Sequence, residues 1–110
     1  MTYPVIVKNR ATQDLRQAAN YLLVQGTTEV AERFLESAET AFAQLATAPA
    51  IGKVVHLVSP VLGEIRQWRM KGFQDYLIFY RFQNDQVEVV RVLHGKRDLE
   101  DILANLEEED

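Results

Sequence analysis

The sequence contains no cysteine and only two histidines, His56 and His94. Without cysteine there is neither a disulfide framework nor a thiolate metal site, and so few histidines argue against a zinc site. No apolar run approaches the roughly 20 residues that a membrane-spanning helix needs. The first ten residues, MTYPVIVKNR, lack the apolar core of a secretory signal. We therefore expect a cytoplasmic chain with no metal, no cofactor and no membrane contact.

The composition is that of an ordinary soluble globular protein, with 47% hydrophobic and 25% charged residues. A chain of 110 residues is long enough for one domain with one core. We expect a single domain over residues 1–110. Its last four residues, 107–110, have no apolar side chain and are expected to fray.

The net charge of −4 is unevenly distributed along the chain. Residues 1–52 hold four basic and five acidic residues, and residues 53–97 hold eight basic and four acidic residues. Residues 98–110 hold seven acidic residues and no basic one. The acidic end is either a solvated tail or a partial screen for a basic region that binds an acidic partner.

Two apolar runs organise the chain, Tyr76 to Phe82 and Val87 to Leu93. Both are rich in aromatic and β-branched residues, and neither alternates cleanly, which predicts two strands buried on both faces. Between them, Gln83-Asn84-Asp85-Gln86 predicts a four-residue hairpin loop.

Arg81 and Arg91 interrupt these apolar runs. A buried guanidinium group is unfavourable unless it is paired or reaches solvent. One interpretation is structural, with each arginine paired to an acid such as Glu64, Glu88 or Asp98. The other is functional, with the cation exposed to a bound macromolecule.

Two helices are predicted before these strands. The first follows a cap at Thr12, carries Asp14 in its first turn and ends at Gly26, while Thr27 or Thr28 caps the second. Apolar residues recur at helical spacing in both: Leu15, Ala18, Ala19 and Leu22 in the first, and Ala31, Phe34, Leu35, Ala38, Ala41, Phe42 and Leu45 in the second. So short a connection predicts an antiparallel helix hairpin.

The remaining segments complete the predicted order β-α-α-β-β-β-α. Tyr3 to Val7 forms a strand that Pro4 places at a sheet edge or at its first residue. Residues 47–60 are expected to be loop, Leu62 to Met70 a strand, and Asp98 the cap of a last helix reaching Leu106. These elements predict an α+β fold, a helix hairpin packed on a mainly antiparallel sheet.

The order and spacing of several short motifs resemble the ParE/RelE superfamily of toxins from type II toxin–antitoxin systems. The motifs are Ala11 with Asp14-Leu15, Tyr21, Phe42-x-x-Leu45-Ala46-x-x-Pro49-x-x-Gly52, Ile65-Arg66, Tyr76-Leu77-Ile78-Phe79-Tyr80-Arg81 and Arg91-Val92-Leu93-His94-Gly95-Lys96-Arg97-Asp98-Leu99. The last two look more like the ParE branch. The resemblance covers almost the whole chain.

The resemblance to the ParE branch implies a toxin that inhibits DNA gyrase and is neutralised by a cognate antitoxin. It implies a target-binding surface comprising Arg66, Arg81, His94, Lys96 and Arg97. Leu22, Phe34 and Leu35 on the helix hairpin are expected to bind the antitoxin, together with an exposed sheet edge. The toxin is expected as a homodimer or as a hetero-oligomer with the antitoxin.

The RelE branch, which cuts messenger RNA on the ribosome, is the alternative. Cleavage needs a base, an acid and cations that stabilise the phosphorane. Arg66, Arg81 and Arg97 are candidate cations, and His94 is the candidate base or acid. However, RelE-like nucleases carry a further tyrosine or histidine near the C-terminus, and residues 95–110 contain neither. A third hypothesis is an inactive relative that only binds its antitoxin.

Overall fold

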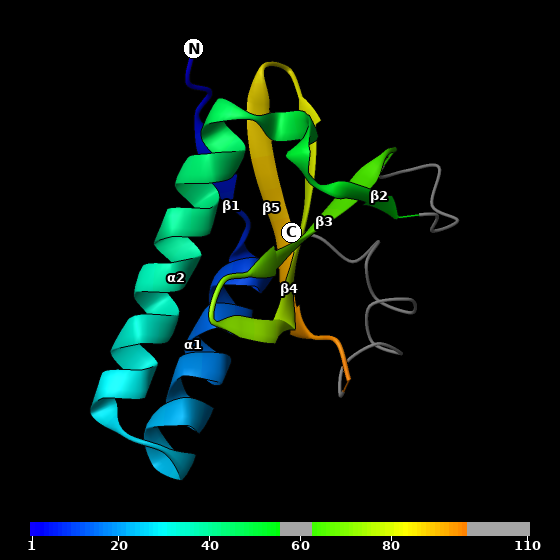
Figure 1. Cartoon of the computed structure of the whole chain (residues 1–110). Coiled ribbons are helices and arrows are strands. Elements are labelled where there is room, and N and C mark those ends of the chain that lie inside the picture. Colours follow the sequence, from blue (N-terminus) through cyan, green and yellow to red (C-terminus); the bar gives the residue numbers. More distant parts are fainter. Residues whose placement is uncertain (56–62, 97–110) are drawn as a thin grey trace.

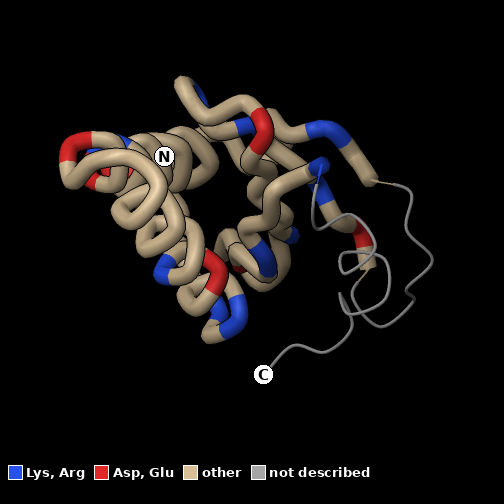
Figure 2. Tube along the Cα trace, turned by 90° about the horizontal axis from the view of Figure 1, so that it is seen from below, with Lys and Arg blue, Asp and Glu red and all other residues tan. Residues whose placement is uncertain are grey.

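A helix hairpin covers one face of a five-stranded sheet (Figure 1). The computed structural model describes residues 1–55 and 63–96. Helices α1 (Asn9–Gln25) and α2 (Thr28–Thr47) run antiparallel, and the view from below places both to one side of the strands (Figure 2). The predicted α+β fold is therefore confirmed.

The sheet has the strand order β1-β5-β4-β3-β2. The strands are β1 (Val5–Val7), β2 (Lys53–Val55), β3 (Ile65–Met70), β4 (Phe73–Gln83) and β5 (Gln86–His94). β1 pairs in parallel with β5, and the other neighbours are antiparallel. β1 lies at an edge, as Pro4 predicts.

Residues 47–60 were wrongly expected to be all loop. They include a 3-10 turn at Pro49–Ile51 and strand β2, whose three residues are too few to show a periodic pattern. The predicted helix from Asp98 to Leu106 lies outside the described residues.

The β4–β5 turn is tighter than the predicted four-residue loop. Gln83 pairs with Gln86, and only Asn84 and Asp85 lie between them, with φ values of 54° and 57°. Two central residues at positive φ are typical of the type I′ turn, which matches the twist of the flanking strands. Asn and Asp tolerate this conformation better than most residues.

An extra residue in β5 changes which side chains face the helices. Phe79 pairs with Arg91, whereas Tyr80 pairs with Val89, so Val90 is unmatched. Val89 and Val92 both lie in the core beneath the helices, although a spacing of three would put them on opposite faces of a regular strand. This bulge explains why apolar and polar residues do not alternate in the sequence of β5. As predicted, the strand is buried on both faces.

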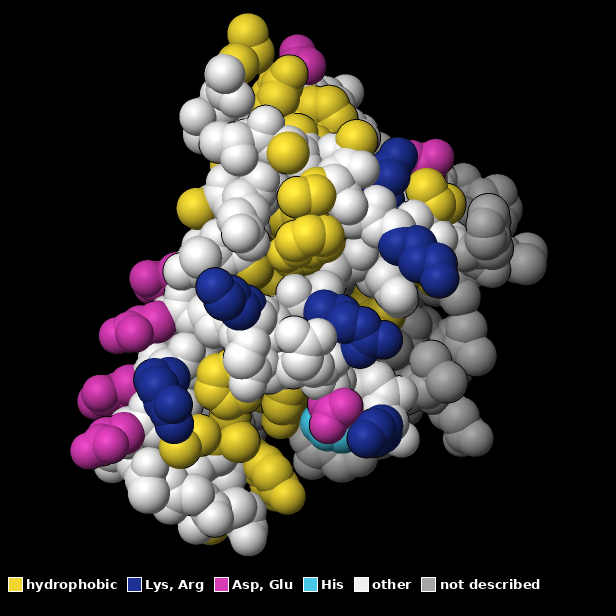
Figure 3. Space-filling model, viewed as in Figure 1, with side chains coloured by type: hydrophobic (Ala, Val, Ile, Leu, Met, Phe, Trp, Pro, Cys, Tyr) yellow, Lys and Arg dark blue, Asp and Glu magenta, His cyan; other side chains and the backbone are white. Residues whose placement is uncertain are grey.

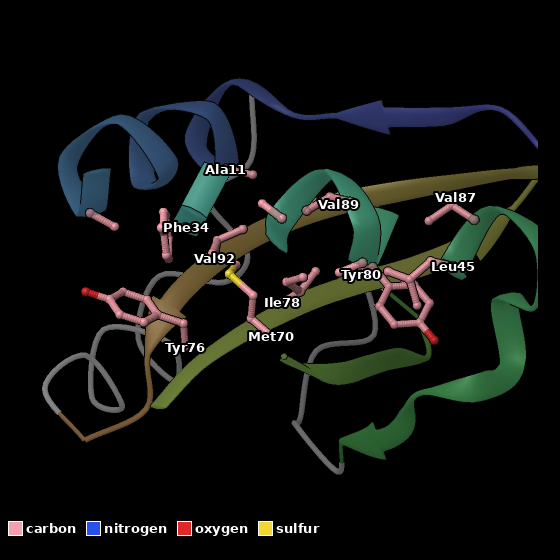
Figure 4. Packing of buried hydrophobic residues seen from close by; sticks show 13 residues of the cluster. Ala11, Phe34, Leu45, Met70, Tyr76, Ile78, Tyr80, Val87, Val89 and Val92 are labelled. Carbon is pink, nitrogen blue, oxygen red and sulfur yellow. The ribbon is translucent and has the colours of Figure 1, made fainter. Parts of the chain in front are cut away.

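The core beneath the helices is built on Phe34, which is fully buried on α2 (Figure 4). Its ring meets those of Phe73 and Tyr76 edge to face, with centroid distances of 5.3 and 4.9 Å. Small side chains elsewhere on the hairpin allow its close approach to the sheet: Ala11, Ala18, Ala38 and Ala41 are all buried in this core.

A buried ion pair fastens α1 to β5. Arg91 donates from Nε to Asp14 Oδ2 over 2.8 Å and from Nη2 to Oδ1 over 3.1 Å. The Val92 amide also donates to Asp14 Oδ2, over 3.0 Å. Because β1 ends at Val7, the carboxylate takes the place of the missing strand partner at this point.

The position of Asp14 corrects two predictions. The helix begins at Asn9, not after Thr12, because Thr12 N already donates to Lys8 O in the first helical turn. Asp14 therefore lies beyond the first turn. Arg91 pairs with Asp14, which was not among the acids named from the sequence. The predicted cap at Thr27 is confirmed by its bond from Val30 N.

Replacing Asp14 by Ala is expected to lower the free energy of unfolding by about 3–5 kcal/mol, because it leaves a buried guanidinium without a counter-charge. Urea unfolding at neutral pH measures the change, with the exposed Glu29→Gln as the control. Asp14→Leu with Arg91→Met should regain most of the loss. A single-variant loss below about 1 kcal/mol would contradict the assignment.

A second fastening holds the segment before β2. The buried Tyr80 hydroxyl donates to Pro49 O over 2.7 Å and accepts from Gly52 N over 2.8 Å. Burial raises the pKa of Tyr80, although the Gly52 bond and the charge of Arg66 act in the opposite direction. A Cβ on Gly52 would lie 2.5 Å from the hydroxyl oxygen and 2.8 Å from Gln67 O, so only glycine fits.

Gly52→Ala is expected to destabilise the protein by about 1–3 kcal/mol, since the methyl group has to displace Tyr80 or the β3 backbone. Thermal unfolding followed by circular dichroism tests this. The nearby Ala50→Ser, at an exposed position, provides the control. An unchanged melting temperature for Gly52→Ala would contradict the prediction, because it would show that Tyr80 and the β3 backbone can move to make room for the methyl group.

Candidate functional site

The structure separates the predicted target-binding residues instead of gathering them. Arg66 pairs with Tyr80 across β3 and β4 and so shares its face, whereas Arg81 is the next residue and points to the opposite face. His94 pairs with Tyr76, four residues along β4 from Tyr80, a spacing of about 13 Å. Arg97 lies outside the described residues. Arg66, Arg81 and His94 therefore do not form one site.

The guanidinium group of Arg66 is hydrogen-bonded and ion-paired within the chain. Its Nη1 donates to Gly52 O over 2.8 Å and to Ala50 O over 3.2 Å, and its Nη2 lies 3.0 Å from Glu64 Oε1. These contacts hold the segment that leads into β2. Glu64, which we had named as a partner for Arg81 or Arg91, pairs with Arg66 instead.

Arg81 forms a nearly buried ion pair with Glu88. Their side chains are 12% and 8% exposed, and Nε lies 2.8 Å from Oε1. Gln86 donates to the other carboxylate oxygen over 3.2 Å. Burial alone would raise the pKa of Glu88, but hydrogen bonds from Arg81 and Gln86 and the charge of Arg81 hold this pKa below its ordinary value. Arg81 is therefore paired with Glu88, one of the acids that the sequence analysis named for it.

Glu88→Gln is expected to remove part of the protein's acid sensitivity. Because the pKa of Glu88 is lower in the folded than in the unfolded chain, its stabilisation is fully present above the ordinary value of 4.5 and is lost as pH falls through the folded-state pKa. Urea unfolding between pH 7 and pH 3 measures this. The exposed Glu36→Gln should keep the wild-type pH dependence, and an unchanged profile for Glu88→Gln would contradict the role of the pair.

The corner where β5 ends brings His94 and Lys96 together around Asp75 (Figure 3). His94 Nε2 lies 3.9 Å from Asp75 Oδ2, and Lys96 Nζ lies 3.5 Å from Oδ1. Gly95 N donates to Asp75 O over 2.7 Å, which fixes the turn. The Lys96 side chain is 77% exposed and that of His94 only 16%. Of these two side chains, Lys96 is thus the accessible one.

Beside this corner lies a pocket of about 380 Å³ between α1 and the start of β4. Its walls include Tyr21, Leu22, Phe73 and Tyr76 along with Asp75 and His94. Leu22, predicted to bind the antitoxin, therefore lines this pocket.

A second, apolar groove of about 570 Å³ runs between the two helices on the hairpin. Leu15, Ala19 and Leu23 line it from α1, and Ala31 and Leu35 from α2. Leu35 is 43% exposed, as a binding residue has to be. Leu23 is 46% exposed and was missed, because it falls outside the apolar stripe of its helix.

The prediction that Phe34 binds the antitoxin is wrong. The side chain predicted to bind the antitoxin is fully buried against Phe73 and Tyr76 and presents nothing at the surface. The apolar stripe of α2 is wide, so one part of it faces the core and another part faces the groove. Helical spacing alone could not show that Phe34 faces the core while its neighbour Leu35 faces the groove.

Within residues 1–55 and 63–96, no group of three His, Asp or Glu side chains is arranged to hold a metal ion. Over the same residues, neither helix is long and apolar enough to cross a membrane.

Comparison with known proteins gives a family and a fold. A family model described as the ParE toxin of the type II toxin–antitoxin system parDE matches residues 5–99. The chain is similar to a solved structure titled "Chromosomal ParDE TA system from P. aeruginosa", with a TM-score of 0.68 and 15% identity over 84% of this chain and 96% of that chain. At this identity the likeness shows a shared fold. No curated protein matches the sequence.

Proposed function

The chain belongs to the ParE toxin family of type II toxin–antitoxin systems, and from this premise we propose that it binds and inhibits DNA gyrase in the cytoplasm. Gyrase inhibition is what the resemblance to the ParE branch implies. The observation that carries the proposal against an RNA-cutting role is the dispersal of Arg66, Arg81 and His94. A nuclease would need such groups around one phosphate.

The corner at the end of β5 is the proposed contact with gyrase. Lys96 is exposed and able to pair with a carboxylate of the target, and His94 lies next to it. Arg97 follows in the sequence and is retained in the proposal. Arg66 and Arg81 are left out, because carboxylates and carbonyls of the chain itself already occupy them.

The hairpin groove and an edge of the sheet are the proposed contacts with the antitoxin. Leu35 and Leu22 offer apolar area on the hairpin. At the β1 edge, Pro4 O and Lys8 N bond towards β5, so the backbone groups of Val5 and Val7 face away from it. Such an edge can accept an added strand. The antitoxin would then cover both and form a hetero-oligomer with the toxin.

Purified wild-type protein is expected to inhibit gyrase in a DNA supercoiling assay. Lys96→Glu should need about ten times more protein for half inhibition, because it places a like charge against the target surface. Lys53→Glu is the matched control: it reverses another exposed lysine, on the edge strand β2, and should inhibit like wild type.

Absence of inhibition at large excess would contradict the proposal. Messenger RNA cleavage on translating ribosomes would assign the chain to the RelE-type activity instead. Harmless overproduction without antitoxin, in a host whose gyrase it should recognise, would favour the inactive relative.

A further inference from the structure

The two sides of the hairpin groove carry different charge. On α2, Glu29, Glu32, Glu36 and Glu39 follow one another at intervals of three, four and three residues, which places them on one stripe. Glu32 lines the groove, so this stripe runs along its α2 side. Figures 2 and 3 show acidic residues gathered on the outer side of α2, away from the sheet.

The opposite side of the groove is nearly neutral. Thr12, Arg16 and Asn20 line it at intervals of four residues on α1, and Arg16 is the one cation among the described lining residues. No ion pair among the described residues includes a member of the glutamate stripe. The carboxylates are thus available to a partner.

We infer that the groove binds an amphipathic helical segment of the antitoxin that carries lysine or arginine along the flank facing α2. Its apolar side chains would fill the floor formed by Leu15, Ala19, Leu23, Ala31 and Leu35. Its cations would lie over the glutamate stripe, and uncharged polar residues would lie over α1. The inference rests on the proposed function, and it adds the orientation and charge of the bound segment.

Charge argues against other occupants. Nucleic acid would place phosphates against the glutamate stripe, which repels them. A second copy packed by a twofold axis would place its glutamate stripe against the glutamate stripe of the first copy, which is repulsive. Otherwise it would place that stripe against the α1 side of the groove, where Arg16 is the single cation among the described lining residues. Lysine or arginine residues along one flank of a partner helix can instead pair with all of the glutamates in the stripe.

Two synthetic 16-residue helical peptides test the inference. They share one leucine and alanine face and differ only in one flank, which is lysine in the first and glutamate in the second. Fluorescence anisotropy with the full chain at low salt should show about tenfold tighter binding of the lysine peptide, from a few exposed charge pairs. The difference should shrink at high salt because these pairs are screened.

Glu32→Gln with Glu36→Gln should remove most of this preference. The control, Glu64→Gln with Asp85→Asn, neutralises two exposed acids outside the groove and should keep it. Equal affinity of the two peptides, or no binding of either, would overturn the inference. Concentration-dependent self-association that Leu35→Glu abolishes would assign the groove to a second copy and overturn it as well.

Binding of the cognate antitoxin separates the two proposals. If it binds wild type and loses about fivefold affinity with the Glu32/Glu36 double variant, the inference is supported. If it binds both equally, the inference fails and the proposed function stands. If it does not bind wild type, the proposed function fails.

Discussion

The contact of Asp14 with the Arg91 guanidinium and the Val92 amide fixes where α1 lies on the sheet. A buried charge pair contributes little net stability. However, a buried charge without its partner is strongly destabilising, so the two side chains have to stay in contact. It therefore acts here as a positional constraint. The position of α1 sets the hairpin, and the hairpin sets the groove between its helices and the pocket beside His94.

The bulge at Val90 is the second constraint, since it lets β5 serve both faces of the sheet. One face carries the core beneath the helices, and the other carries a smaller apolar cluster around Phe79. Strand alternation then distributes the cations: Arg66 and Arg81 leave by opposite faces, and each meets a carboxylate. Within the described residues, these two cations are thus each paired inside the chain and do not converge on one point.

Much of the fold could be predicted from the sequence, because helical spacing, the cap at Thr27 and the apolar runs of β4 and β5 are local signals. The partner of Arg91 could not, since Asp14 and Arg91 are 77 residues apart and nothing local links them. Strand β2 was too short to show a period, and Phe34 and Leu35 lie on one wide apolar stripe whose division depends on the sheet. For the site, the corner motif predicted Lys96 and His94 as neighbours, and Glu88 was among the acids named for Arg81, but the pairing of Arg66 with Glu64 was not predicted.

The parallel pairing of β1 with β5 joins the first strand of the chain to the last described one. Translation delivers these strands far apart in time. The residues of the proposed antitoxin groove, all before Thr47, leave the ribosome well before Asp75 and the corner that follows it. Because Asp14 contacts Arg91 and β1 pairs with β5, the helices of the hairpin cannot take their described place on the sheet until these later residues have also been synthesised.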